Sequence, residues 1–192
     1  MSYAGKFLLS KGQDCIILRD IPIQSKVSMK RSTKSSRDLG SREAYWEGLI
    51  LSEANLQSGE VFYIGLGYYL VQSVNPDPES REHIFFSAKC NKTLIHKRYE
   101  EHSDNDNNVI QEWVALHDNV HSYIEIVTYQ LRQFDPGLLE QTRYIAQVPK
   151  SLGSLLLDRF IFDGNKYQVE SIDDSGMEGV SRLQLGIDTR PD

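Results

Sequence analysis

The stretch Glu60-Val-Phe-Tyr-Ile-Gly-Leu-Gly-Tyr-Tyr-Leu-Val-Gln-Ser-Val74 occurs a second time, without a gap, as Asp158-Arg-Phe-Ile-Phe-Asp-Gly-Asn-Lys-Tyr-Gln-Val-Glu-Ser-Ile172. Phe62 aligns with Phe160, and Tyr69 aligns with Tyr167. In each copy, apolar residues alternate along two arms, and a turn that contains glycine joins the arms, which is typical of a hairpin whose turn needs a positive φ. The sequence therefore predicts two related β-hairpins and an internal duplication.

Further alternating segments flank both hairpins. Strands are predicted after them, at residues 84–90 and 183–187, because apolar residues recur there at every second position. Weaker matches precede them, at 43–51 aligned with 140–148, and earlier still at 21–33 and 122–134. About five short strands in each half, separated by turn residues, are typical of small antiparallel barrels or sandwiches. The predicted fold class is all-β, with two such modules in tandem.

The boundary between the modules is predicted from a change in composition. Residues 100–108 are polar and short of apolar side chains, which is typical of a loop. The next run, residues 109–120, is too short for its periodicity to distinguish a helix from a strand. We therefore expect a first module at residues 1–98, a linker at 99–119 and a second module at 120–192.

Composition indicates a globular protein. Hydrophobic residues make up 40% and charged residues 25% of the 192 residues, which excludes global disorder. No apolar run approaches the roughly 20 residues that span a bilayer, so no membrane partner is expected. The N-terminus lacks the apolar segment of a signal peptide, which predicts a chain that is cytoplasmic when it is made. Cys15 and Cys90 are expected to be reduced thiols.

Basic residues are concentrated in one segment of a chain whose net charge is −6. A long loop at residues 30–43 is predicted, and it is rich in serine and poor in apolar residues. One interpretation is a solvated hairpin tip, and the other is a contact with phosphate or with an acidic neighbour. The candidate interaction residues are Lys30, Arg31, Lys34, Arg37 and Arg42.

Patterns for metal binding and catalysis are incomplete. Asp104, Asp106 and Asn108 have the opening spacing of a calcium loop, but Val109 and Ala115 stand where the glycine and the bidentate acid belong. The pair His117 and His121, with Glu112 and Asp118 nearby, lacks a third strong zinc ligand. No Gly-x-Ser-x-Gly elbow occurs. No metal, no cofactor and no enzymatic activity are therefore predicted.

Two phrases resemble a known family. Residues 30–46 are similar to the loop of head-closure, or stopper, proteins of tailed-phage connectors: a basic and hydroxylated strand end, an Asp-x-Gly turn at Asp38 to Gly40, and an acidic and aromatic return strand. Residues 159–174, with Asp163-Gly164 and Ser171-Ile172 followed by two acids, are similar to a later phrase of that family. Family members usually have one such barrel, whereas this chain has two predicted modules, and the second lacks the basic loop.

The resemblance implies a structural protein of the virion neck without catalytic activity. It would form a homo-oligomeric ring, six-fold or twelve-fold by analogy, at the head–tail junction. Its implied partners are the portal or adaptor and the tail proteins, together with packaged DNA or a neighbouring subunit at the basic loop. Two alternatives stay open: a tail-completion or baseplate adaptor, and an oligonucleotide-binding barrel in which Tyr63, Tyr68 and Tyr69 stack on bases.

Overall fold

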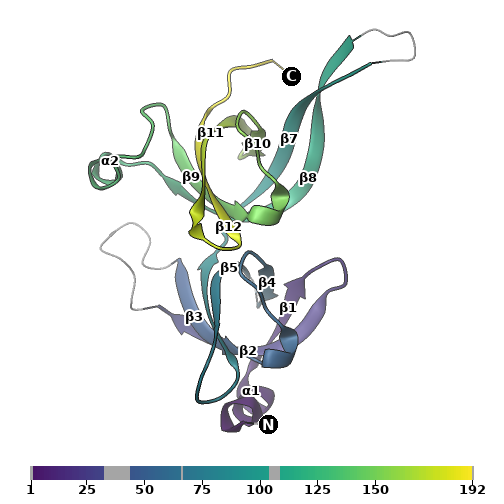
Figure 1. The fold of residues 1–192 in the computed structure, drawn as a ribbon, viewed down its shortest axis with the longest axis vertical. Helices are drawn as coiled ribbons and strands as arrows, with labels where there is room; N and C mark the ends of the chain where they lie inside the picture. The colour runs from purple at the N-terminus through teal and green to yellow at the C-terminus, as the bar shows by residue number, and fades with distance from the viewer. Residues whose placement is uncertain (1, 33–43, 66, 104–108, 192) are drawn as a thin grey trace.

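The computed structural model describes residues 2–32, 44–65, 67–103 and 109–191, and it contains two closed six-stranded antiparallel barrels. Figure 1 shows the barrels one above the other along the long axis of the molecule. Barrel 1 consists of β1 (Gln13–Leu18), β2 (Ile23–Arg31), β3 (Tyr45–Ile50), β4 (Val61–Ile64), β5 (Gly67–Pro76) and β6 (His83–Lys89). Barrel 2 consists of β7 (Lys92–Ser103), β8 (Val109–Ile126), β9 (Tyr144–Pro149), β10 (Arg159–Phe162), β11 (Asn165–Met177) and β12 (Val180–Ile187). Within these residues, four short helical segments accompany the strands: α1 (Tyr3–Lys11), η1 (Ser52–Ala54), α2 (Tyr129–Phe134) and η2 (Lys150–Leu152).

The two barrels have the same topology, which confirms the predicted duplication. Strands neighbour one another in the order β1-β2-β3-β6-β5-β4 in barrel 1 and β7-β8-β9-β12-β11-β10 in barrel 2. Phe62 is paired with Tyr69 across the first hairpin, as Phe160 is with Tyr167 across the second. Both hairpins continue into a register shift at the same place, between Val71 and Ser73 and between 169 and 171. The all-β tandem expected from the sequence is therefore the observed fold.

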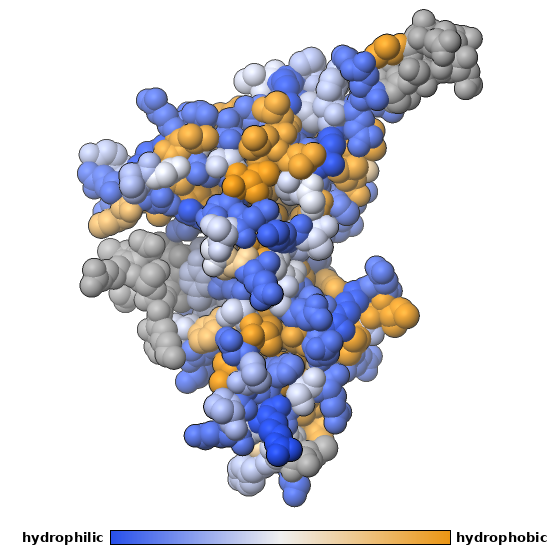
Figure 2. Space-filling model, in the orientation of Figure 1, coloured by the Kyte–Doolittle hydropathy of each residue, from blue (hydrophilic) through white to orange (hydrophobic). Residues whose placement is uncertain are grey.

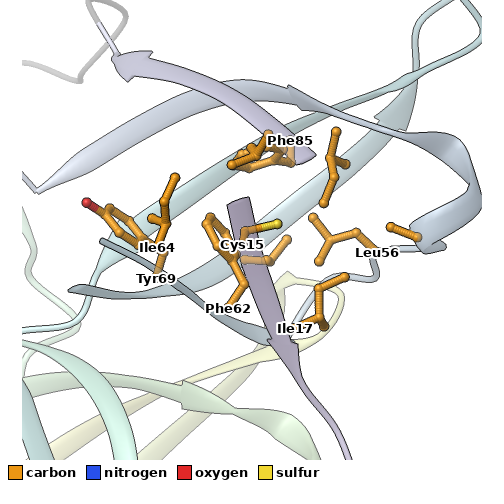
Figure 3. Packing of buried hydrophobic residues seen from close by; sticks show 11 residues of the cluster. Cys15, Ile17, Leu56, Phe62, Ile64, Tyr69 and Phe85 are labelled. Atoms are coloured by element: carbon orange, nitrogen blue, oxygen red, sulfur yellow. The ribbon is translucent and has the colours of Figure 1, made fainter. Parts of the chain in front are cut away.

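The repeated hairpin supplies the centre of each core. Phe62 and Phe160 are 1% and 0% exposed and so occupy equivalent core positions, as predicted. Figure 3 shows Phe62 packed with Tyr69, Phe85 and Cys15 inside barrel 1. In barrel 2 the second hairpin turns at Asp163 and Gly164, whose φ angles of 50° and 74° are both positive, as its two-residue turn requires.

The predicted linker is wrong. Residues 99–103 and 109–119 belong to β7 and β8, which form the longest hairpin of barrel 2. The chain passes from β6 to β7 through Cys90 and Asn91 alone, so the boundary lies about eight residues before the predicted end of the first module. Each barrel also has six strands where about five were expected, and residues 129–134, predicted as part of a strand, form α2.

A small apolar cluster joins the barrels. Val61 and Leu70 of barrel 1 pack against Val180 of barrel 2, and all three are buried. The Tyr68 ring stacks on His121, with centroids 3.6 Å apart. The turn before β12 lies so close to barrel 1 that a Cβ atom added at Gly179 would be 2.0 Å from the carbonyl oxygen of Ser58. The joint also contains polar contacts, since Gln72 Nε2 donates a 2.7 Å hydrogen bond to Gln147 Oε1, and the backbone approach at Gly179 leaves no room for a side chain.

We expect Gly179→Ala to destabilise the protein by about 1 to 3 kcal/mol, because backbone atoms of both barrels must move apart to admit the methyl group. Chemical denaturation would measure the change. Gly176→Ala, near the end of β11, is the matched control, since a Cβ atom there meets nothing closer than an Asp173 oxygen at 3.7 Å. Equal effects from the two variants would contradict the close approach at Gly179.

Both outer ends of the tandem are covered by chain termini. At the lower end, α1 packs against barrel 1 through the fully buried Leu8, and Ser2 Oγ donates a 2.8 Å hydrogen bond to Glu82. At the upper end, the segment after β12 lies over Arg159, which is fully buried. By register, Arg159 and Gln168 correspond to Val61 and Leu70 of the joint. The apolar face that binds a second barrel is thus polar and covered in barrel 2, as in the capping repeat of an array.

Candidate functional site

The basic residues predicted to interact lie at one end of β2, as far as the structure describes them. Lys30 Nζ lies 3.4 Å from Glu47 Oε1, its neighbour on β3, and the Lys30 side chain is 77% exposed. The Arg31 guanidinium lies over the Trp46 ring, 5.8 Å from its centroid. Lys34, Arg37 and Arg42 lie outside the described residues. We call Lys30 and Arg31, with their β3 partners, the basic end.

The long β7–β8 hairpin is a second projecting feature that the sequence did not reveal. β10 pairs with β7 only at residues 95–97, and β9 pairs with β8 only at 123–126. Beyond these limits the two strands pair only with each other, within the part of the chain that the structure describes, and Figure 1 shows them extending away from barrel 2. We call residues 98–103 and 109–114 the arm. Its outer edges carry backbone donors and acceptors without a ladder partner, which is the requirement for strand addition.

The two faces of the arm differ in chemistry. On one face, the Tyr99 and Trp113 rings lie 5.2 Å apart, and the Tyr99 hydroxyl donates a 3.0 Å hydrogen bond to Gln111 Oε1. On the other face, Glu100 lies directly opposite Glu112 in the ladder, and both are exposed. Like charges directly opposite each other on a sheet are destabilising. The two faces of the arm therefore differ in character, one aromatic and the other acidic.

A cation–aromatic cluster fixes the base of the arm. The Arg159 guanidinium lies 3.6 Å from the centroid of the Trp113 ring, and Arg190 approaches the same ring at 4.7 Å. Arg159 Nε donates a 2.6 Å hydrogen bond to the buried Asp188, and Trp113 Nε1 donates one of 3.0 Å to the carbonyl oxygen of Pro191. The C-terminal segment thus ties the arm to barrel 2 and sets its direction.

An arginine–carboxylate clasp occurs at the same place in both barrels. Arg98 donates two hydrogen bonds, of 2.8 and 2.7 Å, to Asp158, and a third of 2.8 Å to the carbonyl oxygen of Gly153. In barrel 1 Arg19 makes the corresponding bonds to Glu60 and to the carbonyl oxygen of Asn55. The two copies of the repeated stretch begin at Glu60 and Asp158. These two aligned acids were the sequence signal from which the clasps could have been found. Because each clasp holds the segment after a 3₁₀ turn against a strand, it stabilises the fold.

Barrel 2 adds a buried histidine to its clasp. His96 is 0% exposed, and its Nε2 lies 2.8 Å from Asp158 Oδ2. Its ring stacks on Phe160 at 4.6 Å, and by register it replaces Ile17 of barrel 1. Burial raises the pKa of Asp158, but hydrogen bonds from Arg98, His96 and the Leu155 backbone outweigh it and lower the pKa to about 2. The carboxylate is thus held ionised inside the barrel wall.

The two buried carboxylates predict acid sensitivity. Burial also raises the pKa of Asp188, and bonds from Arg190 and Arg159 outweigh it, so that its pKa is about 2 against an ordinary value of 3.8. Because the folded-state pKa values are lowered, the unfolded chain binds more protons in this range, and stability is lost as the pH falls from about 4 to about 2. Denaturation midpoints measured from pH 5 downward would show the loss. Asp158→Asn should have a shallower dependence than the unaltered protein, and identical slopes would contradict the assignment.

The other candidate residues lie apart or inside the fold. Among the described residues, no three His, Cys, Asp or Glu side chains gather as a metal site. His117 and His121 lie on β8, and Asp104, Asp106 and Asn108 fall outside the described residues. Within the described chain, no helix has the length and apolar character needed to cross a bilayer. Cys15 and Cys90 are free thiols, and burial raises their pKa values to about 11 and about 12.

The tyrosines of the nucleic-acid alternative are used in packing. Tyr69 is 7% exposed and stacks on Phe62 at 5.3 Å inside barrel 1. Tyr68 stacks on His121 in the joint. Tyr63 lies 5.2 Å from Tyr68. At least two of the three rings therefore have protein partners where bases would have to stack.

Comparisons with known proteins identify no relative of this chain by sequence. No family model matches it, and no curated protein matches it. Among solved structures, the chain is similar to K. pneumonia MrkH in its apo state, with a TM-score of 0.20, 6% identity, and coverage of 98% of this chain and 83% of that chain. The MrkH–c-di-GMP complex gives a TM-score of 0.17 and 8% identity, with coverage of 97% and 83%. These scores are too low to carry a family or a function to this protein.

Proposed function

We propose that this protein is a structural component of a tailed-phage neck, where it forms a ring between the portal or adaptor and the tail. The ring would close the head and join it to the tail, without catalytic chemistry. The resemblance of residues 30–46 and 159–174 to head-closure proteins supports the proposal. In the fold, the described parts of these phrases belong to β2 and β3 of barrel 1 and to β10 and β11 of barrel 2.

The main structural support for the proposal is the arm, which projects from two otherwise closed barrels. A closed barrel has no free strand edge, so it cannot recruit another chain by strand addition. The arm supplies two such edges, and the basic end supplies a separate charged contact. A ring needs two different surfaces on each subunit, because each copy must bind one neighbour on either side. This body has both.

Reconstitution tests the proposed function. Purified protein added to portal-bearing heads that lack neck proteins should form a stoichiometric ring at one vertex, even if it is a monomer alone, because contacts of modest area persist on a template. Electron microscopy of labelled protein would locate it. Binding scattered over the capsid, or no binding to heads or tails, would rule out a neck role.

The basic residues give a sharper version of this test. Neutralising Lys30, Arg31, Lys34 and Arg37 to glutamine should leave folding nearly unchanged, since surface substitutions cost within about 0.5 kcal/mol each. Particles assembled with this variant should lose DNA or fail to join tails. The control neutralises four exposed lysines elsewhere: Lys6, Lys11, Lys89 and Lys150. Full infectivity with the first variant would show that the loop is a solvated tip.

A further inference from the structure

We propose that copies of this chain associate through barrel 2, where an apolar segment before β10 of one copy packs into an apolar hollow after β10 of the next. The segment consists of Leu155, Leu156 and Leu157, and we call it the leucine knob. The hollow, which we call the socket, includes Ile126 and Ile187 in its lining. The contact joins neighbours in the ring, and for the ring itself it rests on the proposed function.

The leucine knob is exposed, although its backbone is fixed. Its three side chains are 54%, 61% and 58% exposed, and Figure 2 shows apolar side chains gathered on the visible face of barrel 2. The Leu155 amide donates a 2.7 Å hydrogen bond to Asp158 Oδ2, and the Leu157 amide donates one of 2.9 Å to the carbonyl oxygen of Val169. Arg190 donates a further bond, of 2.8 Å, to the carbonyl oxygen of Leu157. A preorganised segment of this kind loses little backbone entropy when it binds.

The corresponding segment of barrel 1 is a contact surface. Residues 57–59 align with the knob, and they are glutamine, serine and glycine. The Gly59 amide donates to the carbonyl oxygen of Val71, which is the bond that the aligned residue of the knob also makes. Barrel 2 lies over this segment, and the Gly179 amide donates a 3.2 Å hydrogen bond to Ser58 Oγ. The position of the knob is therefore a docking position in the barrel whose neighbour the structure shows.

Leu157 has a backbone conformation that disfavours leucine. Its φ angle is 68°, and that of Gly59, at the aligned position, is 85°. In this left-handed region a Cβ atom lies too close to the following carbonyl oxygen, and glycine avoids the strain. A strained and exposed leucine costs stability in the free chain, so we attribute it to a contact with another molecule.

The socket lies at the other end of β10 from the knob. It is a hollow of about 410 Å³, and residues 164–167, which follow β10, form part of its lining. The lining also includes the Tyr144 ring, together with Ile126 and Ile187, whose side chains are 60% and 55% exposed. Exposed aliphatic side chains around a hollow are typical of a protein–protein contact, and they suit a leucine.

Barrel 1 differs at both surfaces. By register, Ile126 and Ile187 of barrel 2 correspond to Arg31 and Lys89 of barrel 1. The knob corresponds to the glutamine, serine and glycine of residues 57–59. Both surfaces are thus charged, polar or small in one barrel and apolar in the other, on the same topology. Because the two surfaces differ together, we infer that they meet. Because they lie at opposite ends of one strand, they can meet only between two copies.

The contact is head-to-tail, since the knob and the socket are different surfaces. Each copy donates one knob and receives another, and a fixed rotation between copies closes such a chain of subunits into a ring. The two arginines beside the knob, Arg98 and Arg190, are bound to Asp158 and Asp188. The knob therefore brings a surface of low net charge to its neighbour, although the chain has a net charge of −6.

Transplanting barrel 1 residues into barrel 2 tests the contact. The knob variant carries Leu155→Gln, Leu156→Ser and Leu157→Gly, and the socket variant carries Ile126→Arg and Ile187→Lys. The knob variant should be at least as stable in urea as the unaltered protein, because barrel 1 holds the same residues on the same backbone and glycine relieves the strain. Sedimentation of concentrated protein should show that each variant associates at least about tenfold more weakly than the unaltered protein.

An equimolar mixture of the two variants distinguishes a head-to-tail contact from a symmetric one. The socket variant keeps its knob and the knob variant keeps its socket, so the mixture should form 1:1 pairs that add no third copy. A disulfide between Leu156→Cys in one copy and Ile187→Cys in another should capture the contact even when it is weak. Faster cross-linking of Leu156→Cys to its own kind would overturn the inference, because knobs would then pair with each other.

The control is Ile21→Ser, between β1 and β2, which removes a side chain that is 81% exposed and should leave association unchanged. Equal association of all variants, no pairs in the mixture, or no self-association and no cross-links at the highest soluble concentration would also overturn the inference. Binding to portal-bearing heads is measured separately. Association through the knob without binding to heads would reject the neck function alone. A ring on heads that is the same with the knob variant would reject the knob–socket contact alone.

Discussion

Replacing Phe160 by alanine is expected to lower the free energy of unfolding by about 3 to 5 kcal/mol. The side chain is 0% exposed, packs in the core of barrel 2 and stacks on His96 at 4.6 Å. Truncation removes its dispersion contacts and leaves a cavity that the closed barrel wall cannot fill by collapsing. Urea denaturation followed by fluorescence and circular dichroism would measure the change.

The control for this prediction is Phe134→Ala. Phe134 is 77% exposed on α2, so its loss should change stability by less than about 0.5 kcal/mol. Phe62→Ala in barrel 1 should match Phe160→Ala, since the two positions are equivalent. A cost below about 1 kcal/mol for Phe160→Ala would place the residue outside the core and would undermine the equivalence of the two hairpins.

Replacing Asp188 by alanine is expected to lower the free energy of unfolding by about 3 to 5 kcal/mol, because the charge of Arg159 then stays buried without its counterion. Both side chains are 0% exposed, and their atoms lie 2.6 Å apart. Loss of the Asp188 side chain is also expected to weaken the hydrogen bonds from Arg159 to the backbone of Arg190 and Pro191. Residues 188–191, which lie over Trp113, would then become more mobile. Hydrogen exchange at residues 188–191 would report the release.

A double substitution separates the charge from the packing. Arg159→Val restores at this position the residue type of Val61, and combined with Asp188→Ala it removes the stranded cation. The pair should cost less than the sum of the two single changes, since neighbours in one ion pair are not additive. Asp135→Ala, which breaks a half-exposed pair with Arg182, should cost at most about 1 kcal/mol. If the free-energy changes of the two single variants added up to that of the double variant, Arg159 and Asp188 would not stabilise the protein as a pair.

The repeated hairpin was predictable because both of its copies bury one face. Apolar residues alternate along residues 60–74 and 158–172 because one face of each strand is buried and the other is not, and the glycine turns mark where the chain reverses. The earlier strands were harder: the aligned segments 43–51 and 140–148 are offset by one position from the observed register, in which Trp46 corresponds to Tyr144. Their weak similarity did not fix the pairing.

The arm could not be predicted from alternation, because it projects from the barrel and both of its faces meet solvent. A strand without a buried face has the polar composition of a loop, and residues 99–119 were assigned to a linker for that reason. The assignment also placed the start of β7 in the first module and left the second module one strand short, whereas the strand missing from the first module is β1, which was not predicted. The clasps were missed for a different reason: Arg19 and Glu60 are 41 residues apart, and only the fold brings them together.

The joint between the barrels has a consequence for stoichiometry. A one-barrel protein that builds two layers must recruit the second layer from solution, and the layers can then differ in copy number or fall out of step. Here Val61, Leu70 and Val180 join the two barrels within one chain, and the matching place on barrel 2 holds the fully buried Arg159. If n such chains assemble, the assembly therefore contains 2n barrels, and the two kinds of barrel are present in equal number.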